Sequence, residues 1–86
     1  MPTRPSQDDP KRVKVWERRR RALGARVVQL RTERGLTQVE LSAKSGISRN
    51  VLIDVEQGRR GLLYERLGDL AKALGVSASD LLEGIR

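Results

Sequence analysis

The stretch from Thr37 to Gly58, TQVELSAKSGISRNVLIDVEQG, restricts the possible folds of this chain more than any other. Thr37 is followed three residues later by Glu40, which is the capping-box pattern that starts a helix. Gly46 is a typical left-handed helix stop, and Ser48 soon after it can cap the start of a new helix. The pattern therefore predicts two short helices joined by a tight glycine turn.

The second of these helices, residues 48–57, has two different sides when its residues are placed at 100° intervals. Leu52, Val55 and Glu56 fall on one side, and the two aliphatic residues are suited to a core. The opposite side is mixed polar and includes an isoleucine, with an arginine at its flank: Asn50, Ile53, Asp54, Gln57 and Arg49. Asn can pair with adenine, Arg with guanine or phosphate, Asp with cytosine and Ile with a thymine methyl. This side therefore has the chemistry to read base edges in DNA.

Residues 11–34 are predicted to form a helix that is longer than a small core needs. Three residues at helical spacing make one apolar stripe: Leu23, Val27 and Leu30. Trp16 lies on the same side, but arginines separate it from the stripe, and Gly35 ends the pattern. The buried part is therefore expected to begin near Arg21 or Ala22. The segment before it should extend beyond the core, either helical or frayed.

The C-terminal part of the chain is predicted to add two more helices. One runs from about Leu63 to Leu74 and is closed by a glycine. Ser77 starts a short last helix, which carries Leu81 and Leu82 and extends toward Ile85. No stretch alternates strongly enough to predict a strand. The predicted fold class is therefore all-α, with five helices.

The net positive charge of the chain lies entirely in its first part. Residues 1–34 hold eleven Lys and Arg against four Asp and Glu, whereas residues 35–86 hold seven of each. A polyanion is the natural partner of such a segment, although a solvated helix start or a tail that aids solubility would carry the same charge. We predict a basic, partly disordered arm over residues 1–20 and a folded domain over residues 21–86. The residues of the basic segment expected to contact a nucleic-acid backbone are Lys11, Arg12, Lys14, Arg18, Arg19, Arg20 and Arg21.

The composition argues against several other classes of function. The sequence has no His and no Cys, which removes the commonest general base, the thiol nucleophile and any thiolate metal site. It also lacks a phosphate-cradling glycine loop and a cluster of metal ligands, so we predict no enzyme activity, no cofactor and no metal. One Trp and one Tyr do not make a set of aromatics for stacking single-stranded bases. No apolar run is long enough to span a membrane, and we expect a cytoplasmic protein.

The apolar positions, caps and glycines of residues 23–82 occur in the order of a known family. The matching pieces are LGARVVQLRTERGLTQVELSAKSGISRNVLIDVEQGRR and then LGDLAKALGVSASDLL. They resemble the phage-repressor (Cro-type, XRE-like) helix-turn-helix DNA-binding family over about two thirds of the chain. The resemblance implies a lambda-repressor-like domain, here with a basic N-terminal extension. It also implies a sequence-specific, double-stranded DNA-binding transcription regulator that is encoded by a bacterium or phage and acts at the nucleoid.

The resemblance further implies roles for individual residues, with helix 48–57 as the recognition helix in the major groove. Arg31 and Glu56 match a structural ion pair between the first and third helices. Asp54 would lie near phosphates, which is unfavourable unless it reads a cytosine or pairs with Arg49. Gln38 matches a residue that grips the DNA backbone. Contact with DNA is implied for Thr37, Gln38, Ser48, Arg49, Asn50, Ile53, Asp54, Arg59 and Arg60, of which the last two lie in a loop that approaches phosphates.

The resemblance also implies a homodimer on a two-fold DNA site. Leu81, Leu82 and Ile85 are the expected contacts, because a short terminal helix cannot bury all three against a small core. An alternative function is a protein-interaction module on the same fold, such as an antitoxin or a coactivator-like adaptor, that acts mainly through a partner protein. Exposed apolar residues would then make the contact: Leu62, Leu63, Tyr64 and Ile85.

Overall fold

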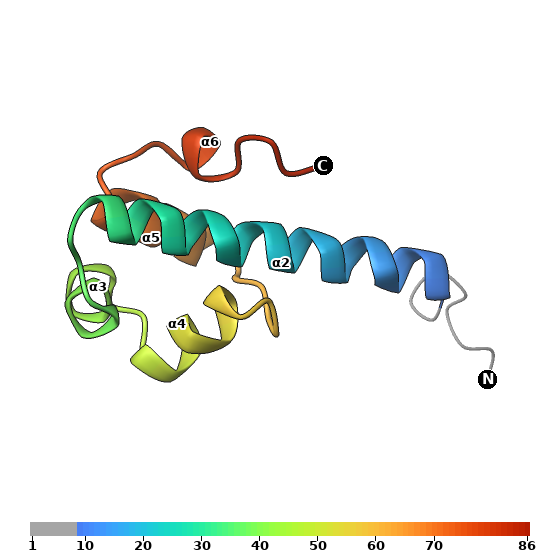
Figure 1. Cartoon of the computed structure of the whole chain (residues 1–86), viewed down its shortest axis with the longest axis horizontal. Helices are drawn as coiled ribbons and strands as arrows, with labels where there is room; N and C mark the ends of the chain where they lie inside the picture. Colours follow the sequence, from blue (N-terminus) through green and yellow to red (C-terminus); the bar gives the residue numbers. More distant parts are fainter. Residues whose placement is uncertain (1–8) are drawn as a thin grey trace.

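The computed structural model describes residues 9–86, and this part of the chain contains five helices and no strand. In order they are α2 (Pro10–Glu33), α3 (Gln38–Ser45), α4 (Arg49–Glu56), α5 (Tyr64–Ala73) and α6 (Ala78–Leu81), as Figure 1 shows. The predicted all-α, five-helix fold class is therefore confirmed. The prediction of disorder at the start of the chain falls mostly on residues 1–8, which lie outside the described residues.

The core consists of aliphatic side chains drawn from all five helices and from the turn between α3 and α4. Burying a side chain such as Leu or Val stabilises the folded state by roughly 1.5–3 kcal/mol relative to leaving it exposed. The described core contains no aromatic side chain, so Trp16 and Tyr64 both lie outside it. Its eleven buried hydrophobic residues are Leu23, Val27, Leu30, Leu41, Ile47, Leu52, Val55, Leu70, Ala71, Leu74 and Leu81.

Helix α2 is one continuous helix, and its N-terminal half extends past the rest of the domain (Figure 1). Asp9 caps its start by accepting a hydrogen bond from the Lys11 amide at 2.9 Å, and Pro10 occupies the first turn, where no amide is needed. The first buried apolar residue is Leu23, close to the expected start of the buried part. The segment before it, which could have been helical or frayed, is helical from Pro10 onward. The division into an arm and a domain at residue 20 stays a prediction, because α2 runs through that point.

The predicted caps and glycine turn of the central helix pair are present. Thr37 Oγ1 accepts from the Glu40 amide at 3.1 Å, and the Thr37 amide donates to Glu40 Oε1 at 3.0 Å. Gly46 ends α3 with a φ of 73°, in the left-handed region that favours glycine. Ser48 Oγ then accepts from the Val51 amide at 3.3 Å and caps α4. Both short helices therefore begin and end where the sequence predicts.

The capping box also affects the acid–base behaviour of Glu40. The hydrogen bond from the Thr37 amide, together with that to the Thr37 side chain, holds the pKa of Glu40 below its ordinary value. Because the folded pKa is lowered, the stabilising contribution is present at neutral pH. It is lost only in acid, as the pH falls through the lowered folded pKa.

The last helix is shorter than predicted. Helix α6 covers only Ala78–Leu81, with Ser77 as its N-cap, and Leu82 already lies outside it. Gly84 has a φ of 79°, a left-handed conformation that cannot continue a right-handed helix. The prediction that this helix extends toward Ile85 is therefore wrong.

Helices α2 and α4 cross closely at Gly24. We therefore expect this position not to accept a larger side chain. A Cβ at Gly24 would lie 2.3 Å from the Val55 carbonyl oxygen and 2.6 Å from that of Glu56. Both are backbone atoms that cannot rotate away, so we expect Gly24→Ala to force the helices apart and to cost about 1–3 kcal/mol of stability. Urea unfolding followed by circular dichroism would measure this cost.

The matched control for this prediction is Gly68→Ala in α5. An added Cβ at Gly68 meets no atom within 4 Å, and alanine favours a helix over glycine by up to about 1 kcal/mol. The control should therefore be as stable as the parent protein or slightly more so. Equal stability of Gly24→Ala and the parent would contradict the close crossing.

Candidate nucleic-acid interface

The outer face of α4 is turned away from the core. Leu52 and Val55 are fully buried, and they hold the helix by one side against the core. Because these two residues face the core, the opposite side of α4 faces outward, as predicted from the angular positions of its residues. Of the predicted reading residues, Arg49, Asn50 and Gln57 are exposed, whereas Ile53 and Asp54 are half-buried.

Gln38, at the start of α3, is anchored to the end of α4. Its Nε2 donates to Glu56 Oε1 at 2.9 Å, which leaves one N–H and the carbonyl oxygen of the amide for another partner. The neighbouring N-cap residue, Thr37, is exposed. The first amides of a helix point outward without intrahelical partners and favour an anion. The start of α3 therefore offers a fixed amide side chain and free backbone donors on the same side.

Arg31 and Glu56, the residues expected to form a structural ion pair, do so in the structure. Arg31 Nε lies 2.7 Å from Glu56 Oε2, and Arg31 Nη2 lies 3.1 Å from Glu56 Oε1, so the pair is bidentate. Arg31 Nη1 also donates to the Leu36 carbonyl at 3.0 Å. The Glu56 side chain is only 4% exposed and that of Arg31 18%. Together with Gln38, the pair joins α2, α3 and α4 at one buried point.

Asp54 has a different partner from the one considered in the sequence. Arg59 donates to Asp54 Oδ1 from Nε at 3.0 Å and from Nη2 at 2.8 Å. The chain turns back at Gly58, with a φ of 75°, and this turn places Arg59 against the last turn of α4. The alternative pairing of Asp54 with Arg49 is therefore wrong, because Arg49 forms no salt bridge within the described residues. The pair balances the negative charge of Asp54 on the reading face, and its exposure limits its contribution to about 1 kcal/mol or less.

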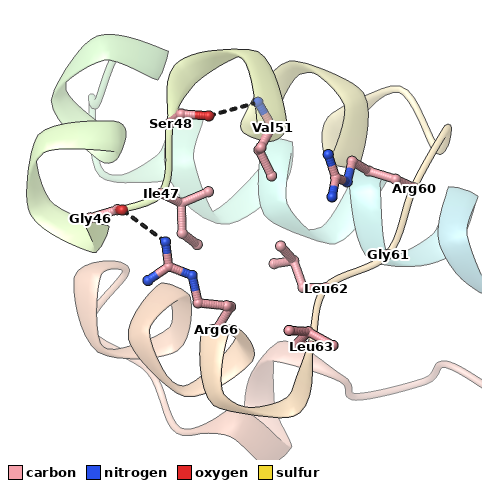
Figure 2. A pocket seen from close by; sticks show the side chains of 9 residues that line it. All are labelled: Gly46, Ile47, Ser48, Val51, Arg60, Gly61, Leu62, Leu63 and Arg66. Carbon is pink, nitrogen blue, oxygen red and sulfur yellow. Dashed lines mark hydrogen bonds between the residues drawn. The ribbon is translucent and has the colours of Figure 1, made fainter.

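Arg60 lies beside a cleft of about 570 Å³ between the start of α4 and the connector that leads to α5. Figure 2 shows Arg60, Leu62 and Leu63 on the connector side of this cleft and Ile47 and Ser48 on the other side. Arg66 closes one end of the cleft, because its Nη2 donates to the Gly46 carbonyl at 2.9 Å. This role of Arg66 is not predicted from the sequence. The contact spans twenty residues, and no local pattern signals it.

The basic residues at the start of α2 surround the helix instead of lining one side of it. Lys14 and Arg18 lie on the side away from the core, whereas Arg12 and Arg19 flank the core side. Six of the seven predicted backbone contacts in this segment are exposed. The exception is Arg20, which is half-buried and whose Nε is buried without a hydrogen-bond partner among the described residues. No single flat surface can therefore contact all seven cations at once.

Two kinds of feature are absent from the part of the chain that the structure describes. Within residues 9–86, no group of three or more His, Cys, Asp or Glu side chains is arranged to hold a metal ion. No helix in this part of the chain is both long enough and apolar enough to cross a membrane.

Most of the described chain is similar to proteins of one family. Residues 27–81 match the helix-turn-helix family. The chain is 44% identical over 63 residues to an uncharacterized HTH-type transcriptional regulator, y4dJ, of Sinorhizobium fredii, and the match covers 73% of this chain and 82% of that protein. It is 38% identical over 60 residues to the immunity repressor protein of Bacillus phage phi105. That match covers 70% of this chain but only 42% of the repressor.

A solved structure has the same fold. The restriction-modification controller protein C.AhdI from Aeromonas hydrophila superposes with a TM-score of 0.70 at 34% sequence identity. The superposition covers 72% of this chain and 90% of the controller protein. The similarity in both sequence and structure therefore spans the helix pair described above and the helices that support it.

Proposed function

The chain belongs to the helix-turn-helix family of DNA-binding transcription regulators, and from this premise we propose that it recognises a specific double-stranded DNA sequence with α4 in the major groove. The observation that carries this proposal is the outer face of α4. Arg49 and Asn50 are exposed on a helix whose other side is locked into the core, and Ile53 lies beside them. These side chains can pair with guanine and adenine and contact a thymine methyl.

The surrounding residues have the chemistry to hold the DNA backbone. The start of α3 offers Gln38 and the free amides that follow Thr37, and the start of α4 offers Ser48 and its own free amides. Arg60 in the connector is exposed. Arg59 donates to Asp54 from Nε and Nη2, so its Nη1 remains available to contact a phosphate. The cations at the start of α2 would add contacts to phosphates farther along the duplex.

We further propose that the protein binds DNA as a homodimer. Leu82 is 38% exposed, and Tyr64, which lines the same hollow, is 82% exposed, so an apolar surface remains uncovered beside α6. The prediction that Leu81 contributes to the dimer contact is wrong, because Leu81 is fully buried in the core of its own chain. Of the three residues named from the sequence, Leu82 is exposed and Ile85 is half-buried.

The other functional hypotheses carry less weight. The alternative of a protein-interaction module, acting as an antitoxin or an adaptor, finds no support among the relatives. A family of transcription regulators also agrees with the prediction that the chain is not an enzyme. Binding to a bacterial or phage genome would place the protein at the nucleoid, in the cytoplasm.

Replacing Asn50 by alanine tests the proposed reading helix. A bidentate contact from Asn to adenine contributes about 1–3 kcal/mol of discrimination between right and wrong bases. We expect Asn50→Ala to lower the ratio of specific to non-specific affinity by roughly tenfold to a hundredfold. The thermal stability should not change, because Asn50 is exposed. Competition binding with the preferred site and with random DNA would measure the ratio.

The control for this experiment is Ser79→Ala, a neutral and exposed position on α6. It should leave both the affinity and the ratio unchanged. An unchanged ratio in Asn50→Ala would show that Asn50 does not read a base.

A further inference from the structure

The part of α2 that extends from the domain, residues 10–21, is here called the overhang, and it carries two further apolar residues on the core-facing side of the helix, beyond the arginines. Val13 and Trp16 follow the same helical spacing as the buried residues farther along α2. Trp16 lies seven residues, or about 10 Å, before Leu23. The hollow beside Trp16 is lined only by residues of α2 and by its cap, Asp9. Trp16, the largest apolar side chain of the protein, is half-buried, and it belongs neither to the hydrophobic core nor to the apolar residues packed against that core.

A groove between α5 and α6 has the size and character to receive such a side chain. Its volume is about 250 Å³, and its lining is mostly apolar, with Leu67 and two small residues, Gly68 and Ala78, among the lining residues. An apolar cavity of about 150 Å³ is large enough to bind benzene, so this groove has room for an indole ring. Tyr64 and Leu82 stand exposed at its edges.

We propose that the overhang docks on a second copy of this chain, with Trp16 inserted in the α5–α6 groove of that copy. This inference rests on the homodimer of the proposed function. Within one chain, a second hollow connects the two features, because Arg19 of the overhang and Leu82 of the groove both line it. The overhang and the groove therefore lie on the same side of the molecule. In a two-fold dimer each copy would give one overhang and receive the other.

Charge complementarity favours a second copy as the occupant. Arg12 and Arg19 flank Trp16 at helical spacing, and both are exposed. Glu65 is exposed at the lining of the groove and forms no salt bridge within the described residues. Docking would bring these arginines toward that carboxylate. Two overhangs packed against each other would instead bring like charges together, which is destabilising.

Tryptophan fluorescence can test the proposal directly, because Trp16 is the only tryptophan of the chain. The full-length protein would be diluted in the absence of DNA, and its emission and its sedimentation mass would be followed together. We expect the emission to shift to shorter wavelength as the dimer forms, with the same midpoint as the change in mass. Burial of an indole in an apolar groove removes it from water and produces this shift.

A variant that fills the groove makes the test specific. Gly68→Leu adds a side chain where no atom lies within 4 Å of the new Cβ, so the fold should tolerate it. We expect it to weaken the dimer by roughly tenfold or more, as for a lost aromatic anchor. Its emission should remain that of the monomer at concentrations where the parent is dimeric. The matched control is Lys72→Leu, which adds the same side chain to an exposed position of α5 outside the groove and should behave as the parent.

Three results would overturn the proposal. A doubling of mass with unchanged emission would leave the dimer intact and exclude Trp16 from its interface. A chain that stays monomeric at every concentration, with constant emission, would exclude both the docking and the homodimer, while DNA recognition would still be judged by the Asn50→Ala experiment. An emission shift that occurs only after DNA is added would place Trp16 on the DNA instead.

Discussion

Glu56→Ala is expected to lower the free energy of unfolding by about 3–5 kcal/mol, the range found when one partner of a buried ion pair is removed. Glu56 accepts two hydrogen bonds from Arg31 and one from Gln38, and its side chain is only 4% exposed. Truncation would leave the mostly buried guanidinium of Arg31 without its carboxylate. The three helices that meet at this point would lose their common contact.

Two further variants separate the cost of leaving Arg31 unpaired from the net contribution of the ion pair to stability. The double variant Arg31→Met/Glu56→Leu removes both charges and keeps apolar volume, so it should be much closer to the parent in stability. Glu56→Gln keeps the shape but removes the charge, and it should fall between the parent and the alanine variant. Denaturant unfolding of all four proteins would give these differences. A loss of less than about 1 kcal/mol in Glu56→Ala would contradict a buried, structural role for the pair.

Affinity for DNA is expected to fall by roughly three to five decades between 50 and 200 mM salt. This follows if about six to ten phosphates are neutralised per dimer, because each contact releases counterions from the duplex. The cations available for these contacts lie mainly on α2 and in the connector after α4. Titration of the affinity against salt concentration gives the number of contacts from the slope.

Individual cations can then be assigned by the change in that slope. Removing one phosphate contact should reduce the slope by about 1 and weaken all DNA sequences equally. Lys14→Ala and Arg18→Ala test the outer side of α2, and Arg60→Ala tests the connector. Lys72→Ala, on the exposed side of α5, is the control and should leave the slope unchanged. A slope near zero for the parent protein would contradict phosphate binding as the source of affinity.

The features that could be predicted from the sequence are those that depend only on residues close together in the chain. The Thr37–Glu40 capping box and the left-handed Gly46 each involve only a few neighbouring residues, so their geometry follows from residue type and spacing. The outer face of α4 was predictable for the same reason, since the angle between residues on a helix is fixed. The assignment of Arg31 and Glu56 came from a family resemblance, because no spacing rule connects residues twenty-five positions apart.

The features that the sequence did not predict depend on how separate elements meet. The partner of Asp54 is set by the turn at Gly58, which returns Arg59 to the helix that the chain has just left. The burial of Leu81 depends on the packing of a four-residue helix against the rest of the core. Arg66 reaches the turn before α4 only because α5 folds back beside it. Each of these contacts requires the tertiary structure, which local patterns do not encode.

Selection of bound sequences from a random double-stranded DNA library tests most directly whether α4 reads sequence. The parent protein should enrich one site made of two half-sites related by two-fold symmetry. Asn50→Ala should lose preference at the base pairs that Asn50 contacts, while keeping the same half-site spacing. Retention of DNA at low salt without enrichment of any sequence would contradict specific recognition by α4, because it would show that the protein binds only the phosphate backbone.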